Sequence, residues 1–256
     1  MKYILTLSMF YLATITPLHI LAKDELIAYV ENLPPSVIVS EDNISGAVID
    51  ILTEALRHSD ISIDYQHINW SRALYESKSK ANIVLTGLNR TLDREEQFYW
   101  LLQLSKATER QGIYLWQLKK TQADEKQKSL NDAVVAMVQG DHKIQYYRDY
   151  IESLGFKANI YEVGSREQVI HMLFKGRVDY ILGGELNRPW HVEALGYDIA
   201  MIERGPKIPN TSRGLYIAIS RKTDINLVHK IEGRLVELAK NGRVSEIMAA
   251  WSKQIK

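Results

Sequence analysis

The sequence contains no cysteine. This absence excludes disulfides, thiol catalysis, Cys-ligated zinc and a lipid-modified cysteine as a membrane anchor. An excess of either charge is also missing, because 32 basic and 31 acidic residues give a formal net charge of +1. Such a balance offers no electrostatic basis for binding nucleic acid or an anionic membrane surface, so we expect neither partner.

The familiar motifs of enzymes and cofactor sites are missing as well. The chain has no Gly-x-Ser-x-Gly elbow, no His-Glu-x-x-His helix and no glycine-rich phosphate or dinucleotide loop. Its seven histidines show no metal-ligand spacing. We therefore expect no cofactor, no metal ion and, as the first interpretation, no enzymatic activity.

A long hydrophobic run occurs only near the N-terminus. Lys2 supplies a positive charge, residues 3–15 are mostly apolar, and Ala22 precedes the charged Lys23. This pattern predicts a signal peptide over residues 1–22, with an uncleaved anchor as the alternative. The apolar part is shorter than the roughly 20 residues that a spanning helix needs. An exported protein without cysteine fits the bacterial periplasm, where we expect it to be free and not a lipoprotein.

The remaining chain alternates between strand and helix patterns. Apolar runs predict strands over residues 26–30, 37–39, 61–68, 81–88, 111–116, 133–138, 160–163, 179–182 and 215–219. Helical spacing predicts helices that begin near residues 46, 70, 143, 166, 227 and 244. The order β-α-β-α-β occurs twice and is typical of α/β proteins with parallel sheets flanked by helices. Two such units joined by two crossings suggest two lobes that close around a ligand.

One strand end gathers residues suited to binding an anion. The apolar run 83–85 leads to Gly87, where we expect the strand to end, and then to Asn89 and a helix-like turn carrying Arg94. Ligands of open α/β sheets lie outside the carboxyl ends of the strands. Arginine presents a planar fork of donors that matches a carboxylate or phosphate. The alternative is a surface arginine paired with a neighbouring glutamate such as Glu95.

Five segments carry a resemblance to a known family. They are NLPP at 32–35, SGAVIDIL at 45–52, TLDRE at 91–95, KGRVD at 175–179 and the stretch from NGR to Trp at 241–251. In this order they resemble motifs of the family 3 extracellular solute-binding proteins of bacteria. The counterparts are a Tyr-Pro-Pro-Phe loop, a Gly-Phe-x-x-Asp-Leu helix start, a Thr-x-x-Arg motif, an Ala-Gly-Arg-x-Asp motif and a C-terminal helix.

The resemblance implies a type II periplasmic-binding-protein-like fold with two lobes and two hinge crossings. It places lobe 1 at residues 23–115 and 214–256, and lobe 2 at residues 116–213. It also implies a monomer that captures a small polar, amino-acid-like ligand bearing a carboxylate for an ABC permease. A sensory or orphan module with a membrane sensor as partner is the alternative.

The resemblance also assigns roles to residues. Arg94 matches the arginine that grips the ligand carboxylate, and Gly87 and Asn89 match strand-end residues that add hydrogen bonds. In the second lobe, Glu185 lies one residue after the family's amine-binding Asp. The glycine-rich helix start of the family is replaced by a segment containing Asp141, whose carboxylate would cap the helix itself.

Other candidates have two interpretations each. Asp141 and His142 are either cleft residues or simple helix caps, and Trp70 is either an aromatic wall or core. Arg72 either lines the cleft or pairs within its own helix. Glu185 and His142 could also face each other as acid and base. That arrangement would make the protein a lyase or hydrolase on the same scaffold, which we place behind the binding function.

Overall fold

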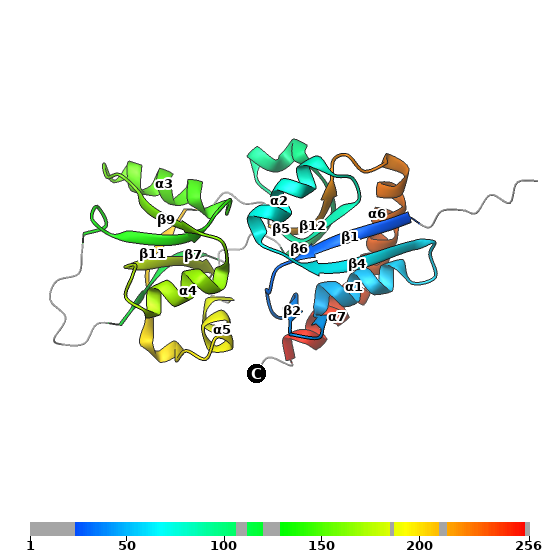
Figure 1. Ribbon diagram of the computed structural model, residues 1–256. Helices are drawn as coiled ribbons and strands as arrows, with labels where there is room; N and C mark the ends of the chain where they lie inside the picture. Colours follow the sequence, from blue (N-terminus) through cyan, green and yellow to red (C-terminus); the bar gives the residue numbers. More distant parts are fainter. Residues whose placement is uncertain (1–23, 106–111, 120–128, 185–186, 210–213, 254–256) are drawn as a thin grey trace, which may run out of the picture.

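The computed structural model describes residues 24–105, 112–119, 129–184, 187–209 and 214–253, and shows two lobes built around separate sheets (Figure 1). The predicted signal peptide at 1–22 and Glu185 lie outside these ranges. No helix within them is both long and apolar enough to cross a bilayer. The α/β, two-lobed architecture confirms the predicted fold class.

The first lobe has a five-stranded sheet in the order β4-β1-β5-β12-β6. Its strands are β1 Asp24–Val30, β4 Ile61–His67, β5 Ile83–Asn89, β6 Phe98–Ser105 and β12 Leu215–Ser220. A two-stranded sheet joins β2 Ile38–Val39 to β3 Ile44–Ser45. The helices are α1 Ala47–Leu56, α2 Trp70–Ser79, α6 Ile225–Lys240, α7 Arg243–Lys253 and the 3-10 turn η1 Leu92–Gln97. β1 pairs in parallel with β4 and β5, whereas the returning β12 is antiparallel to β5 and β6.

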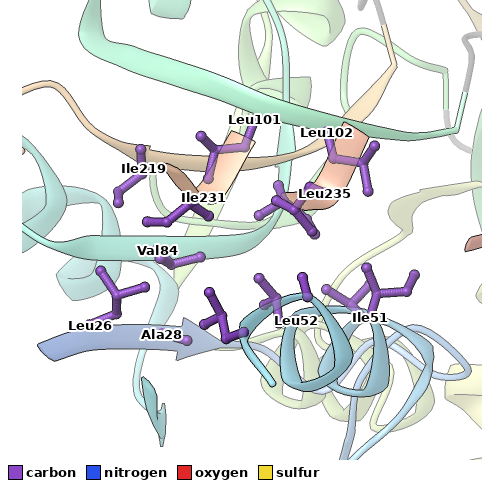
Figure 2. Packing of buried hydrophobic residues seen from close by; sticks show 14 of the residues in the cluster. Leu26, Ala28, Ile51, Leu52, Val84, Leu101, Leu102, Ile219, Ile231 and Leu235 are labelled. Atoms are coloured by element: carbon purple, nitrogen blue, oxygen red, sulfur yellow. The ribbon is translucent and has the colours of Figure 1, made fainter. Parts of the chain in front are cut away.

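The core of the first lobe follows from strand alternation. Side chains of successive strand residues point to opposite faces, so Leu26 and Ala28 join the cluster under α1, α6 and α7. Tyr29 joins the cluster under α2 on the other face. Figure 2 shows the first cluster, in which Ile51 and Leu52 of α1 lie opposite residues of the sheet and of α6. This double coverage makes the sheet a rigid base for its strand ends.

The second lobe repeats the plan with its own five-stranded sheet, in the order β11-β7-β10-β8-β9. Its strands are β7 Ile113–Leu118, β8 Val134–Val138, β9 Asn159–Val163, β10 Tyr180–Gly184 and β11 Ile202–Ile208. Its helices are α3 Lys143–Ser153, α4 Arg166–Phe174, α5 Asn187–Ala194 and the 3-10 turn η3 Ile199–Met201. The sheet separates two apolar clusters, one containing residues of α3 and the other residues of α4 and α5.

Several boundaries differ from the sequence-based expectation. Strands β6 and β11 and helix α5 were not predicted. The strand expected to end at Gly87 continues to Asn89, because Asn89 pairs with Leu215 of the returning β12. The chain leaves the first sheet after Ser105, and β7 pairs only with β10 and β11 of the second sheet. The expected lobe boundary after residue 115 therefore falls inside β7.

Candidate functional site between the lobes

The two lobes touch through side chains at the start of α2. Asn69 caps this helix by accepting a hydrogen bond from the Ser71 backbone, and its Nδ2 donates to the Gly164 carbonyl of the second lobe. Ser71 Oγ donates to the Gln139 carbonyl at 2.8 Å. Gln139 and Gly164 directly follow β8 and β9. The carboxyl ends of the second sheet therefore meet the first lobe, as expected for a site in this fold.

Arg94 lies at this boundary and is only 6% exposed. Its Nη2 donates to the Gly140 carbonyl of the second lobe at 3.0 Å, and Nη1 reaches the Asn89 carbonyl at 3.5 Å. Both acceptors are neutral. Burial lowers the pKa of Arg94, although the charge of nearby Asp141 opposes that shift. A buried cation whose hydrogen bonds go to carbonyl oxygens can accept the negative group of a ligand.

Trp70, the first residue of α2, contacts apolar clusters of both lobes. It packs against the first-lobe cluster that contains Leu74 and Leu85, and against the second-lobe cluster that contains Val138 and Val169. The half-buried ring therefore belongs to the core and to the lobe boundary at once. This position combines the two interpretations of Trp70 that the sequence left open.

A group of charged side chains lines a cavity of about 10 Å³ in the second lobe. They come from the starts of α3, α4 and α5 or just before them, and they are Asp141, Lys143, Arg166 and Arg188. Apolar residues of β8 and β10, with Val169, complete the wall. Within the described residues, no group of acidic and histidine side chains could hold a metal ion.

Asp141 is the anion of this group. Its Oδ1 accepts from the Lys143 backbone at 3.0 Å, its Oδ2 accepts from Lys143 Nζ, and His142 Nδ1 lies 3.1 Å from Oδ1. Burial acts to raise the pKa of Asp141, but Lys143 and His142 outweigh it and hold that pKa well below its usual range. Burial lowers the pKa of His142 to about 4 against the opposing effect of Asp141. His142 is therefore neutral at neutral pH.

Arg166 links the cavity to the first lobe. Its Nη2 lies 2.8 Å from Oε2 of Glu31, which follows β1, and both side chains are largely buried. Burial opposes the charge of Arg166, but the Glu31 and Asp141 carboxylates outweigh it and raise the pKa. Arg166 follows Ser165, which caps α4 and forms a capping box with Gln168. The sequence could have indicated Arg166 only through its place at a helix start beyond a strand end.

The remaining predicted site residues are less well placed to contact a ligand between the lobes. The Arg72 side chain is 69% exposed and pairs with Glu76 of its own helix at 2.7 Å, which matches its structural interpretation. Gly87 is half-buried, and a Cβ there would lie 3.5 Å from Leu33, an ordinary contact. Asn89 contributes its carbonyl to Arg94. Glu185 lies outside the described residues, so its predicted role stays a prediction.

Comparisons with known structures give the same fold. A mutant of the arginine-binding protein ArgBP from T. maritima matches with 18% identity and a TM-score of 0.70, covering 90% of this chain and 96% of that one. A structure from a study of glutathione import through GshT and the cystine ABC importer TcyBC of Streptococcus mutans has 14% identity and a TM-score of 0.71, covering 90% and 95%. A histidine kinase sensor domain similar to periplasmic binding proteins has 14% identity and a TM-score of 0.69, covering 90% and 96%.

The comparison with curated proteins gives no match. The model of one protein family, by contrast, matches residues 26–254, which is nearly all of the chain beyond the predicted signal peptide. The chain therefore belongs to the bacterial extracellular solute-binding proteins, family 3.

Proposed function

We propose that this protein captures a small polar solute bearing a carboxylate between its two lobes. The observation that carries the proposal is Arg94, a buried cation at the lobe boundary whose hydrogen bonds to described residues reach only neutral carbonyl oxygens. A carboxylate can accept two parallel hydrogen bonds from such a guanidinium. Trp70, which contacts both lobes, would supply an apolar wall beside the ligand.

Closure of the lobes would couple to binding. The contacts from Arg94 to Gly140 and from Ser71 to Gln139 exist only when the lobes meet. A ligand that touches both lobes binds the closed form better than the open one, and it shifts the population by that difference in affinity. The Arg94 contact with Gly140 makes the anion-binding residue itself part of the closed interface.

We further propose that the protein works in the periplasm and delivers its solute to an ABC importer without changing it chemically. The family consists of extracellular proteins, and the sequence predicts an export signal. One similar structure comes from work on a cystine ABC importer. His142, the candidate acid or base, is buried against Asp141 with its pKa lowered to about 4, which supports a structural role.

The first test identifies a ligand and then removes Arg94. Native mass spectrometry of the protein purified from its own periplasm, before and after denaturation, would reveal a co-purifying carboxylate. A thermal-shift screen of L-amino acids and small dicarboxylates serves if the ligand is lost during purification. Calorimetry should then show that Arg94→Ala costs at least ~2 kcal/mol of binding free energy, the scale for truncating one partner of a buried charge pair. Arg57→Ala on the exposed end of α1 is the control, and equal affinities for both variants would contradict the proposal.

A sensory role is the second candidate, because a histidine kinase sensor domain has the same fold over 90% of this chain. In that case the occupied protein would contact a membrane sensor instead of a permease. Crosslinking of the ligand-loaded protein in intact cells, followed by identification of its membrane partner, distinguishes the two roles. A permease supports import, and a sensor kinase supports signalling.

A further inference from the structure

Arg188 in α5 is the most deeply buried charge of the second-lobe cavity, at 2% exposure. Its Nη2 donates to the Leu182 carbonyl of β10, whereas Nε and Nη1 have no hydrogen-bond partner within the described part of the chain. Burial, together with the nearby charge of Arg166, lowers the pKa of Arg188 to about 9. An unsatisfied buried guanidinium is costly, so a purely structural role is a poor explanation for it.

The backbone is shaped to admit this side chain. A Cβ on Gly183 would lie 2.2 Å from Nε of Arg188, so the guanidinium passes over β10 at a residue that has no side chain. Arg188 also lies beside Asp141 and Arg166 in the wall of the same cavity. Its free donors therefore belong to a polar site and are not enclosed among apolar residues alone.

The charges of the site do not balance. Lys143 is paired with Asp141 and Arg166 with Glu31, so each buried carboxylate already has a cation. Arg94 and Arg188 remain as buried cations whose hydrogen bonds within the described residues go only to carbonyl oxygens. Buried charges need a partner of opposite sign. Two unmatched cations, one from each lobe, are suited to two negative groups.

We propose that the ligand is a small dicarboxylic acid, with one carboxylate at Arg94 and the second at Arg188. The inference rests on the proposed binding function and names the ligand class for it. The cavity of about 10 Å³ at Arg188 admits one oxygen atom, about the size of a water site. Within the described residues, Asp141 and Glu31 are both occupied, so the pair of arginines selects negative charge at both ends of the ligand.

The experiment compares pairs of ligands that differ by one charge and little in shape. They are L-glutamate with L-glutamine, L-aspartate with L-asparagine, succinate with succinamate, and glutarate with glutaramate. For at least one pair, calorimetry should show that the full-length mature protein binds the doubly acidic member at least about tenfold more tightly, the scale of hydrogen bonds to charged groups. Arg188→Met should abolish this preference while the amide keeps its affinity. Arg177→Met, an exposed arginine of the same lobe, should keep both affinities.

The melting temperature without ligand distinguishes a binding role of Arg188 from a structural one. Because Arg188 is an unsatisfied charge, Arg188→Met without ligand should melt at or above the temperature of the parent protein. Arg188→Lys keeps the charge and serves if the methionine variant fails to fold; it should retain part of the preference. A lower melting temperature for a folded Arg188→Met protein would indicate a structural role and overturn the inference.

The remaining outcomes are also decisive. If amides bind as tightly as acids in every pair, or if Arg188→Met keeps the preference, the dicarboxylate inference fails while the proposed function stands. If no member of any pair binds and no carboxylate co-purifies with the protein, the proposed function fails and the inference fails with it.

Discussion

The two lobes share an architecture but treat buried charge in different ways. In the first lobe, Glu76 of α2 is 8% exposed and accepts hydrogen bonds from Tyr29, Arg72 and Lys80. In the second lobe, Arg188 is more deeply buried, and among the described residues it has one hydrogen-bond acceptor, the Leu182 carbonyl. Hydrogen bonds from Lys80, Tyr29 and Arg72 lower the pKa of Glu76 to about 2, whereas burial lowers that of Arg188 to about 9. The first environment favours the charged form of its residue, and the second disfavours it.

This difference fits a structural role for Glu76 and the binding role proposed for Arg188. A buried charge whose hydrogen-bonding capacity is filled stabilises the fold around it, as Glu76 does by joining α2 to Tyr29 of β1. A buried charge with free donors at a domain boundary is what ligand sites require, because its partner arrives only on binding. The first lobe contributes Arg94 to the boundary, and the second lobe contributes the larger group of charges.

The largest expected effect is on the free energy of unfolding, and it should differ between alanine substitutions at two glycines. Gly46 begins α1 with φ 123, and a Cβ there would lie 2.6 Å from the Ser36 carbonyl oxygen. Gly46→Ala should therefore lower the free energy of unfolding by about 3 kcal/mol, because backbone cannot move aside easily. For Gly183→Ala, the three atoms nearest to the added Cβ all belong to the Arg188 side chain, so this variant should cost less stability and instead disturb acid binding. Urea unfolding and calorimetry measure the two effects, and equal stability losses would contradict the contrast.

The next largest effect concerns the ion pair between Glu31 and Arg166, which joins the two lobes. Glu31→Ala leaves Arg166 without its carboxylate partner. We expect the closed form to lose about 2 kcal/mol of stability relative to the open form. This value is toward the lower end for breaking a buried ion pair, because water can hydrate the arginine once the cleft opens. Small-angle X-ray scattering should show a larger radius of gyration than in the parent protein. Glu54→Ala breaks a more exposed pair with Arg243 inside the first lobe and should leave the radius unchanged. A compact Glu31→Ala protein would show that this ion pair does not hold the lobes together.

Acid should lower the stability of the two lobes in different pH ranges. Below pH 6.5 the unfolded chain protonates His142, whereas the folded protein resists protonation until about pH 4, so stability falls as pH drops through this range. Asp141 opposes this effect, and Lys143 and Arg94 reinforce it. Each such histidine costs up to about 1.4 kcal/mol per pH unit. The contribution of Glu76 is present above pH 4.5 and is lost as pH falls toward about 2.

Thermal unfolding from pH 7 to pH 3 tests this order. His142→Gln should flatten the decline between pH 6.5 and 4, and Glu76→Gln should reduce only the loss below pH 4.5. Unchanged slopes in His142→Gln would show that the second lobe tolerates the protonated imidazole.

The smallest expected effect is that of Arg72. Its side chain is 69% exposed and paired with Glu76 in the same helix, so Arg72→Met should leave ligand affinity unchanged while Arg94→Ala reduces it strongly. Calorimetry with the same ligand measures both variants. A large loss of affinity in Arg72→Met would place Arg72 in the cleft after all and move the site toward the start of α2.

Local patterns were sufficient for most of the secondary structure. Helices α4 and α6 were predicted near residues 166 and 227 from helical spacing, because periodicity is a property of neighbouring residues. Strand β6 was not predicted because its aromatic residues follow η1 without a clear turn signal. The extension of β5 to Asn89 depends on pairing with β12, more than 100 residues later.

The sequence alone determined the α/β class, most of the elements in their order and the choice of Arg94 as the candidate anion-binding residue, because strand ends and short motifs are local in the chain. Only the tertiary structure decided which charges meet. Glu31 and Arg166 are 135 residues apart, and the free donors of Arg188 follow from its passage over Gly183. Pairing and burial of charges depend on distances between elements, and the packing of two lobes sets those distances.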